Sequence, residues 1–351
     1  MLRLWRFIRK KREEIAPGLS YHARTALSWH RYDMGATSIG DYALFAGGRT
    51  IVGRSSYLLD TVDAFLADLE KIWVTPLSEP KQQCPGITFA GKALFIGGMI
   101  TDGYRTSTAE VYDASLTKHA NIEFPFPIGL KVELGQIGNY LIIGNSHLYT
   151  YNPYVYDNTL TLVGMIYSHL ECMRPQCAST GNYLIFAGGV EQSSPNVARK
   201  YHDLVVAYSP DLTEYEATPL SVARVVIDAA SAGNIAIFAG GEMPTLMKVT
   251  DAYGPTLTKY DIDELKGLRE NFASVSLGPY AIFAGGYLDY PYSEYTDTME
   301  VYGSELTRLA GPKLSVKRES LAGTALGDLA FFAGGIYSDA TVDAVDVIEY
   351  S

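Results

Sequence analysis

"GNYLIFAGG", residues 181–189, runs four apolar residues into Ala-Gly-Gly after a Gly-Asn turn, and the 351-residue chain spells this pattern seven times. The other copies are GDYALFAGG (40–48), GKALFIGG (91–98), GNYLIIGN (138–145), GNIAIFAGG (233–241), GPYAIFAGG (278–286) and GDLAFFAGG (327–335). The first glycine of the closing pair recurs every 44 to 52 residues. A period of this length is typical of a stacked or radial repeat fold, because one unit is too small to bury its apolar faces alone.

Each repeat reads as four short strands. The second strand, such as YLIFA, is continuously apolar, which is typical of a strand covered on both faces. The closing glycine pair accepts positive φ and lets another backbone approach closely, and Asn145 replaces the second glycine in the third copy. We expect the Phe before Ala-Gly-Gly to pack in the core between neighbouring sheets.

The two ends of the chain complete one repeat. Residues 341–351, TVDAVDVIEYS, align with residues 61–71, so the last repeat lacks its fourth strand. Residues 19–28, LSYHARTALS, align with the fourth strand of the sixth repeat. A closed ring needs this exchange, because it removes both exposed sheet edges. The sequence therefore predicts an all-β fold: a seven-bladed β-propeller of four-stranded antiparallel blades over residues 19–351, its last blade closed by an N-terminal strand, with residues 1–18 as a basic amphipathic extension.

At these positions the chain resembles the kelch-repeat family of β-propellers. Four apolar residues before Gly-Gly, a downstream Tyr, and an Arg ahead of the next repeat all match the kelch pattern. The Trp that usually follows the Tyr is mostly Leu here, as in YDASL, YGPTL and YGSEL, so the chain is more similar to the divergent Ala-Gly-Gly propellers of bacteria and their phages. The resemblance implies a non-catalytic protein-interaction module, a structural or recognition subunit of a larger assembly such as a virion.

One face of such a propeller carries the longer loops. The loop before the first strand and the loop between the second and third strands lie on the same face of an antiparallel blade, and the second of these varies from repeat to repeat. A rigid scaffold with variable loops is a common recognition surface, and Tyr is enriched at interfaces. We expect partner contacts, or alternatively coverage of the blade edge, from these tyrosines: Tyr104, Tyr287, Tyr290, Tyr292, Tyr295 and Tyr337.

A basic residue precedes the first strand of every repeat, and in six of the seven it follows a Leu by four residues. These residues are Arg31, Lys81, Lys131, Arg174, Arg224, Arg269 and Arg318. Equivalent positions in a ring point at the channel mouth, where they raise a positive potential on an acidic body. They are candidates to bind a carboxylate or phosphate of a partner. The alternative is structural: each residue caps loop carbonyls or pairs with an acid of a neighbouring blade.

The N-terminal segment MLRLWRFIRKK sets apolar residues at helical spacing opposite Arg and Lys. We expect it to dock on another protein through Leu4, Trp5, Phe7 and Ile8; a membrane surface, a nucleic acid and a disordered tail are the alternatives. Residues 1–14 carry a net charge of +4 in a chain of −11, so the remainder carries −15. The acidic body repels nucleic acid and anionic membranes.

The chain lacks the sequence signatures of a catalytic or metal site. Its six His fall at unrelated repeat positions, its three Cys have no zinc spacing, and no Gly-rich phosphate loop precedes a helix. We therefore expect no enzyme activity, no cofactor and no metal. The alternative is a carbohydrate-binding or sugar-active propeller of the mutarotase kind, which holds a glycan at the mouth.

No stretch of the sequence has the apolar length of a membrane span, and the N-terminus has no unbroken apolar segment typical of a secretory signal. Three cysteines do not build a disulfide framework, which favours buried thiols in a reducing compartment. We expect the protein in the cytoplasm or assembled into a particle, with other proteins as its partners.

Overall fold

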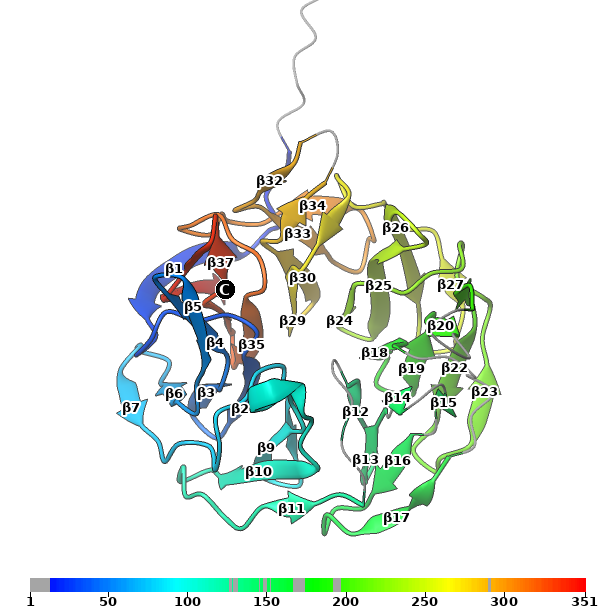
Figure 1. Ribbon diagram of the computed structural model, residues 1–351. Helices are drawn as coiled ribbons and strands as arrows, with labels where there is room; N and C mark the ends of the chain where they lie inside the picture. Colours follow the sequence, from blue (N-terminus) through cyan, green and yellow to red (C-terminus); the bar gives the residue numbers. More distant parts are fainter. Residues whose placement is uncertain are drawn as a thin grey trace, which may run out of the picture.

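The computed structural model describes residues 13–125, 128, 132–144, 146–147, 150–151, 153–166, 174–191, 197–289 and 292–351. Within these residues the chain is all β-structure, with one 3₁₀ turn, η1 (Thr101–Gly103). Seven four-stranded antiparallel sheets form, and we number them 1 to 7 by the chain order of their first strands. Figure 1 shows the sheets around a common centre, with their first strands innermost and their fourth strands at the rim.

The bounds of these strands follow, from sheet 1 to sheet 7. The first strands are β2 (Gly35–Ile39), β8 (Gly86–Phe89), β12 (Leu134–Ile137), β18 (Gln176–Ser179), β24 (Asp228–Ala232), β29 (Ala273–Leu277) and β35 (Ala322–Leu326). The second strands are β3 (Tyr42–Ala46), β9 (Lys92–Ile96), β13 (Tyr140–Ile143), β19 (Leu184–Ala187), β25 (Ile235–Glu242), β30 (Tyr280–Ala284) and β36 (Leu329–Ala333). The third strands are β6 (Val62–Phe65), β10 (Thr108–Asp113), β16 (Tyr154–Tyr156), β22 (Val205–Tyr208), β26 (Leu246–Tyr253), β33 (Met299–Tyr302) and β39 (Ala344–Tyr350). The fourth strands are β7 (Lys71–Trp73), β11 (Ile122–Glu123), β17 (Leu162–Met165), β23 (Glu214–Glu216), β27 (Lys259–Tyr260), β34 (Arg308–Ala310) and β1 (Leu19–Ala26).

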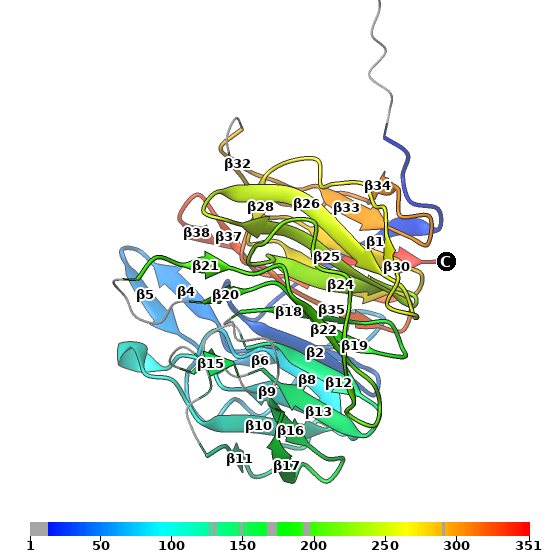
Figure 2. The ribbon, with the colours of Figure 1, turned by 90° about the vertical axis from the view of Figure 1, so that its right-hand side faces the viewer.

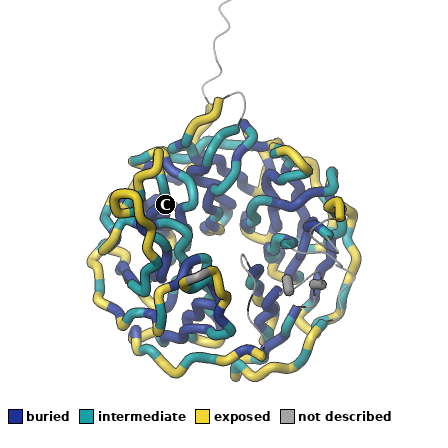
Figure 3. Tube along the Cα trace, viewed as in Figure 1, coloured by how far each residue is buried: buried dark blue, intermediate teal, exposed yellow. Residues whose placement is uncertain are grey.

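The second strands are buried on both faces, as their unbroken apolar sequences predict. In β3, Ala43, Leu44, Phe45 and Ala46 have no exposed surface. Phe45 belongs to a core cluster that joins sheet 1 to sheet 7 through residues such as Val345, so the expected packing of this Phe between sheets is confirmed. Figure 3 shows burial along the inner strands and exposure along the rim.

The N-terminal strand completes the last sheet. β1 pairs antiparallel with β39, from Leu19 opposite Tyr350 to Ala26 opposite Ala344, and the order of sheet 7 is β1-β39-β36-β35. This confirms the predicted exchange between the chain ends. The first strands contact one another in the cyclic order β2, β8, β12, β18, β24, β29, β35 and again β2. Sheet 7 therefore lies against sheet 1 as the other sheets lie against their chain neighbours.

Short hairpins project from one face. They are β4 (Arg49–Val52) with β5 (Ser55–Leu58), β14 (Ser146–His147) with β15 (Thr150–Tyr151), β20 (Val190–Glu191) with β21 (Lys200–Tyr201), β31 (Tyr287–Leu288) with β32 (Glu294–Tyr295), and β37 (Ile336–Tyr337) with β38 (Ala340–Thr341). The segment before a first strand pairs with the start of this loop, as Tyr32 with Arg49 and β28 (Arg269–Glu270) with β31. The prediction that these two loops share a face is confirmed, and Figure 2 shows β4, β5, β21, β37 and β38 on its left side. We call this side the hairpin face.

Residues 13–18 of the expected extension lie against the outer strand of sheet 6. Ala16 N donates to Ala310 O at 2.8 Å, and Ala310 N donates to Glu14 O at 2.9 Å. Ala16 is buried, and Tyr280 donates its hydroxyl hydrogen bond to Pro17 O at 2.8 Å. The last part of the extension is therefore joined to the sheets by backbone hydrogen bonds.

Candidate functional site

Five of the predicted basic residues are buried and paired with a carboxylate of their own sheet. Arg31 pairs with Asp63 at 2.9 Å, Lys81 with Glu110 at 3.0 Å, and Arg224, Arg269 and Arg318 with Asp251, Glu300 and Asp346 at 2.8 Å each. Each of the five cations is at most 2% exposed. The expectation that these five side chains line an open mouth is therefore wrong, because they are buried inside the sheets. The structural alternative fits better, with the acid in the same sheet and not in a neighbouring one.

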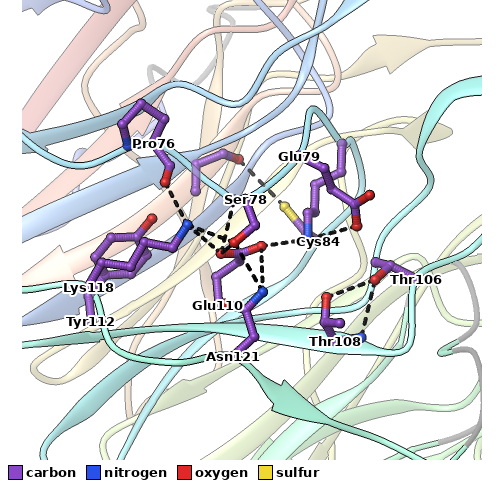
Figure 4. Close-up of polar contacts among 12 residues, drawn as sticks. Pro76, Ser78, Glu79, Cys84, Thr106, Thr108, Glu110, Tyr112, Lys118 and Asn121 are labelled. Atoms are coloured by element: carbon purple, nitrogen blue, oxygen red, sulfur yellow. Dashed lines mark hydrogen bonds and ion pairs between the residues drawn. The ribbon is translucent and has the colours of Figure 1, made fainter.

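Figure 4 shows the pair of sheet 2, with Ser78, Lys118 and Asn121 pointing at the Glu110 carboxylate. Lys118 lies 2.8 Å from Glu110, and the backbone N–H of Ser78 donates to it at 3.1 Å. Burial raises the pKa of this carboxyl, but the hydrogen bond from Lys118 and the charge of Lys81 outweigh burial and hold the pKa of Glu110 below its ordinary value. The ion pair of Lys81 and Glu110 therefore connects the segment before β8 to β10 inside sheet 2.

The glycine pair explains why a long basic side chain fits here. A Cβ on Gly334 would lie 2.3 Å from Arg31 O, and Gly335 N donates to that same carbonyl at 2.8 Å. A Cβ on Gly335 would lie 3.1 Å from the Arg318 Cδ. The first glycine therefore admits the backbone of the next sheet's basic residue, and the second admits the stem of its own sheet's basic residue.

Arg174 occupies a different place in the repeat from the one that its spacing after Leu170 predicts. Gln176 pairs with Ala187 as Gly35 pairs with Ala46, so Arg174 corresponds to Asp33 and not to Arg31. Arg174 has the same positive φ, 58° against 55° for Asp33. Its side chain is half-buried and, among the residues that the structure describes, makes no hydrogen bond or ion pair. Lys131 lies outside the described residues.

The internal ion pair is present or missing as a unit. In these five sheets the acid lies opposite the Phe of the second strand, as Asp63 lies opposite Phe45. The matching residues are Val155 in sheet 3, opposite Ile142, and Val206 in sheet 4, opposite Phe186. Arg31 precedes Gly35, the first residue of β2, by four positions. The residues four positions before the equivalent Leu134 and Gln176 are Leu130 and Cys172 in the sequence, so neither is a cation. Five sheets have both charges and two have neither. Sequence reasoning missed these acids, although an acid two residues before the Tyr in EVYDASL and DAYGPTL was the available signal.

The tyrosines of sheets 6 and 7 form a cluster on the hairpin face. Tyr287 packs edge-on against Tyr295 at 5.2 Å between ring centroids, and Tyr295 packs against Tyr337 at 5.3 Å. Tyr287 and Tyr295 are half-buried, whereas Tyr337 is 45% exposed and Tyr292 is 60% exposed. The structure thus brings three of the six predicted tyrosines into ring contact on adjacent hairpins, and Tyr292 is exposed in the loop of the β31–β32 hairpin.

Tyr104 lies apart from that cluster, after η1 of sheet 2, and is 70% exposed. Tyr290 and the predicted N-terminal docking residues Leu4, Trp5, Phe7 and Ile8 lie outside the described residues.

Polar residues line a hollow where the hairpin face meets the centre. The hollow has a volume of about 210 Å³, and its lining residues are Asp33, Met34, Gln83, Pro85, Asn271, Phe272, Ser320 and Leu321. Ser320 N donates to Asn271 O, Asp33 N to Ser320 O and Gln83 N to Asp33 O, so backbone hydrogen bonds link sheets 6, 7, 1 and 2 around it. Gln83 Nε2 also donates to Asp33 Oδ2 at 3.1 Å. We call this hollow the mouth.

Within the described ranges, no three His, Cys, Asp or Glu side chains gather in a way that would hold a metal ion. No helix among the described residues is long and apolar enough to cross a bilayer. Neither a protein-family model nor a curated protein sequence matches the chain.

Proposed function

We propose that the protein is a seven-bladed β-propeller of the kelch kind and serves as a non-catalytic protein-interaction module within a larger assembly, a particle such as a virion included. Each numbered sheet is one blade. The cyclic contacts of the first strands and the pairing of β1 with β39 support a closed ring. The paired glycines and the internal ion pairs support a kelch-like blade, because they repeat with the same geometry.

The observation that carries the proposed function is the exposure of Tyr292 and Tyr337 on adjacent hairpins, with the Tyr337 ring resting on Tyr295, which in turn rests on Tyr287. Tyr offers a large contact area at a low cost in conformational entropy, and it is enriched in binding hot spots. Rings that already rest on other rings lose little further freedom when a partner covers them. The hairpin face of sheets 6 and 7 is therefore the preferred partner surface.

The internal pairing of the cations supports a binding module over a catalyst. Arg31, Arg224 and Arg318 are held by carboxylates, so they are not free to stabilise negative charge on a substrate. Docking by Leu4, Trp5, Phe7 and Ile8 is a second contact in this proposal and rests on the sequence alone.

The test is a double variant, Tyr292→Ala with Tyr337→Ala, compared in cross-linking and affinity measurements with a partner isolated from the native source. We expect affinity to fall about 30-fold or more, the effect of losing one hot spot of roughly 2 kcal/mol. The matched control is Trp73→Ala with Tyr260→Ala, two exposed aromatics at the rim, 79% and 37% exposed. Equal losses in the two double variants would contradict the hairpin face as the binding surface.

The mouth favours a second candidate, carbohydrate binding. Asp33, Gln83, Asn271 and Ser320 supply acceptors and donors, which sugar hydroxyls require together, and Phe272 supplies an apolar wall. A screen of the protein against a glycan array, repeated with Asn271→Ala, tests it. Retained glycan binding by the variant, or none by the native protein, rejects this candidate.

A further inference from the structure

A cleft lies between the β4–β5 hairpin of sheet 1 and the η1 loop of sheet 2 on the hairpin face. It has a volume of about 390 Å³. Its apolar walls are Tyr57, Leu58, Pro80, Met99 and Ile100. Gln82 fixes the base, because its backbone exchanges two hydrogen bonds with Met99, at 3.0 and 2.9 Å. The cleft is thus built on paired backbone.

The side chain of Gln82 has an unmet requirement at this cleft. Gln82 is 3% exposed and lines the cavity, yet its Oε1 accepts no hydrogen bond from any residue that the structure describes. A buried amide oxygen without a donor is unfavourable, so such groups usually meet a donor from water or a ligand. An N–H group entering the cleft would satisfy it.

One arginine lines the same cleft, and two more stand in the segments that flank it. Arg49 lines the cleft and donates a hydrogen bond to Ser56 Oγ. Arg54 stands in the turn of the β4–β5 hairpin, and the backbone of Arg105 forms an antiparallel β-bridge with Met99. None of the three makes an ion pair within the described part of the chain, in contrast to the five buried cations. Residues 49–58 contain two arginines and no acid, although the whole chain has a net charge of −11. The neighbouring acids in sequence are Asp60, Glu79 and Asp102, and Glu79 lies 3.8 Å from Lys81.

The apolar surface continues beyond the cleft. Tyr57 and Val52 are each 54% exposed, and Tyr104 is 70% exposed. A small molecule held inside the cleft would leave these three side chains uncovered. An extended protein segment that crosses the cleft would cover them, supply backbone N–H groups and bring a side-chain carboxylate.

We propose that this cleft binds an extended segment of a partner protein in which an apolar side chain stands next to Asp or Glu. The apolar side chain enters between Leu58 and Ile100, a backbone N–H of the segment donates to Gln82 Oε1, and the carboxylate pairs with Arg49. This inference rests on the proposed interaction function and names the chemistry of one partner sequence.

The test uses the full chain on an array of immobilised nine-residue peptides. Peptides with Leu-Asp or Phe-Glu at the centre are compared with the same peptides carrying Asn, Gln or Lys in place of the acid. We expect at least tenfold stronger binding to the acidic peptides. We expect Arg49→Glu to remove this preference and to bind the Lys peptides more strongly. We expect Gln82→Met to weaken binding to all the peptides. The thermal unfolding temperature of each variant shows that the fold persists.

The matched control is Arg199→Glu, an exposed arginine beside the β20–β21 hairpin of sheet 4 on the same face. It carries the same charge change and leaves the acidic preference intact. No acidic preference in the native protein, or an equal loss with Arg49→Glu and Arg199→Glu, overturns the inference. If Tyr292→Ala with Tyr337→Ala abolishes partner binding while Arg49→Glu matches its control, the proposed function stands and this cleft is not its site.

Discussion

At the scale of single residues, the closing glycine pair of a repeat stands where neighbouring groups leave little room for a Cβ. Gly334 has φ +62°, and the carbonyl of Arg31 occupies the space that its Cβ would take. The pattern Ala-Gly-Gly therefore marks the contact between successive sheets. It is a packing requirement, and the contact from Gly334 to Arg31 is one of those that join sheet 7 to sheet 1.

We expect Gly334→Ala to destabilise the protein more than Gly327→Ala in the same sheet. Gly327 has φ +58° and no atom within 4 Å of an added Cβ, so its variant costs only the left-handed strain of about 1–2 kcal/mol. Gly334→Ala adds the steric overlap with Arg31 O. Urea unfolding at neutral pH measures both, and equal losses would show that the sheet contact does not depend on this glycine.

At the scale of the sheet, one ion pair connects the entering segment to the third strand. In sheet 5, Asp251 accepts from Arg224 at 2.8 Å and from the backbone of Ser221 at 3.0 Å, and Lys259 lies 2.8 Å away. Sheets 3 and 4 replace both charges by uncharged residues. A buried charge without its partner is costly, whereas a matched apolar pair is tolerated, which explains why the two change together.

The double replacement Arg224→Leu with Asp251→Val copies Leu130 and Val155 of sheet 3 into sheet 5. Asp251→Val alone leaves Arg224 buried and unpaired, and we expect it to cost about 3–5 kcal/mol. The double variant should recover part of that loss, with a coupling of about 0.5–3 kcal/mol in a double-mutant cycle. Strictly additive losses would argue against the internal pair as a unit.

The same carboxyl predicts a loss of stability in acid. Burial raises the pKa of Asp251, but Arg224 and the hydrogen bond from Lys259 outweigh it, so the folded pKa lies below the ordinary 3.8. A depressed folded pKa stabilises the fold above pH 3.8, and this contribution disappears as the pH falls toward the folded value. The stability difference between the native protein and Asp251→Asn should therefore be largest at neutral pH and shrink below pH 3.8. Urea unfolding across this range checks it, and a constant difference would contradict it.

At the scale of the whole molecule, strand pairing brings segments from opposite ends of the chain into one sheet. β1 supplies the outer strand of sheet 7 although more than three hundred residues separate Leu19 from its register partner Tyr350. Without β1, the edge of β39 would expose unpaired backbone groups to solvent and to other chains.

A disulfide between Ser20→Cys and Glu349→Cys tests this closure, because Ser20 and Glu349 are register partners. Facing residues of an antiparallel pair have Cα atoms about 4.5–5.5 Å apart, within the range that a disulfide bridges. We expect the oxidised variant to gain about 2–4 kcal/mol over its reduced form in unfolding experiments. The Ser20→Cys single variant is the control, and failure of the bond to form in the folded protein would place β1 elsewhere.

Much of this architecture could be predicted from the sequence. The position of each second strand, the pairing of the chain ends and the shared face of two loops all follow from local apolar runs and from their period. Those signals are short-range, and each is repeated many times along the chain. Two misalignments left the rest in place. One is that of Arg174. The other is that of residues 341–351, because Asp346 opposite Phe332 corresponds to Asp63 opposite Phe45, so that the segment matches residues 58–68 and not 61–71.

The sequence by itself determined how many strand units there are and in which order they come, because apolar runs and glycine pairs act locally. Only the tertiary structure decided that Arg31 is buried against Asp63, that Arg174 takes the position of Asp33 in its repeat, and that Gln82 Oε1 accepts no hydrogen bond from a described residue. The reason is that burial and pairing depend on groups brought together from distant segments. An Arg four residues after a Leu is available to bind a ligand only when its side chain is exposed. When a buried carboxylate pairs with it, as Asp63 does with Arg31, it stabilises the sheet instead.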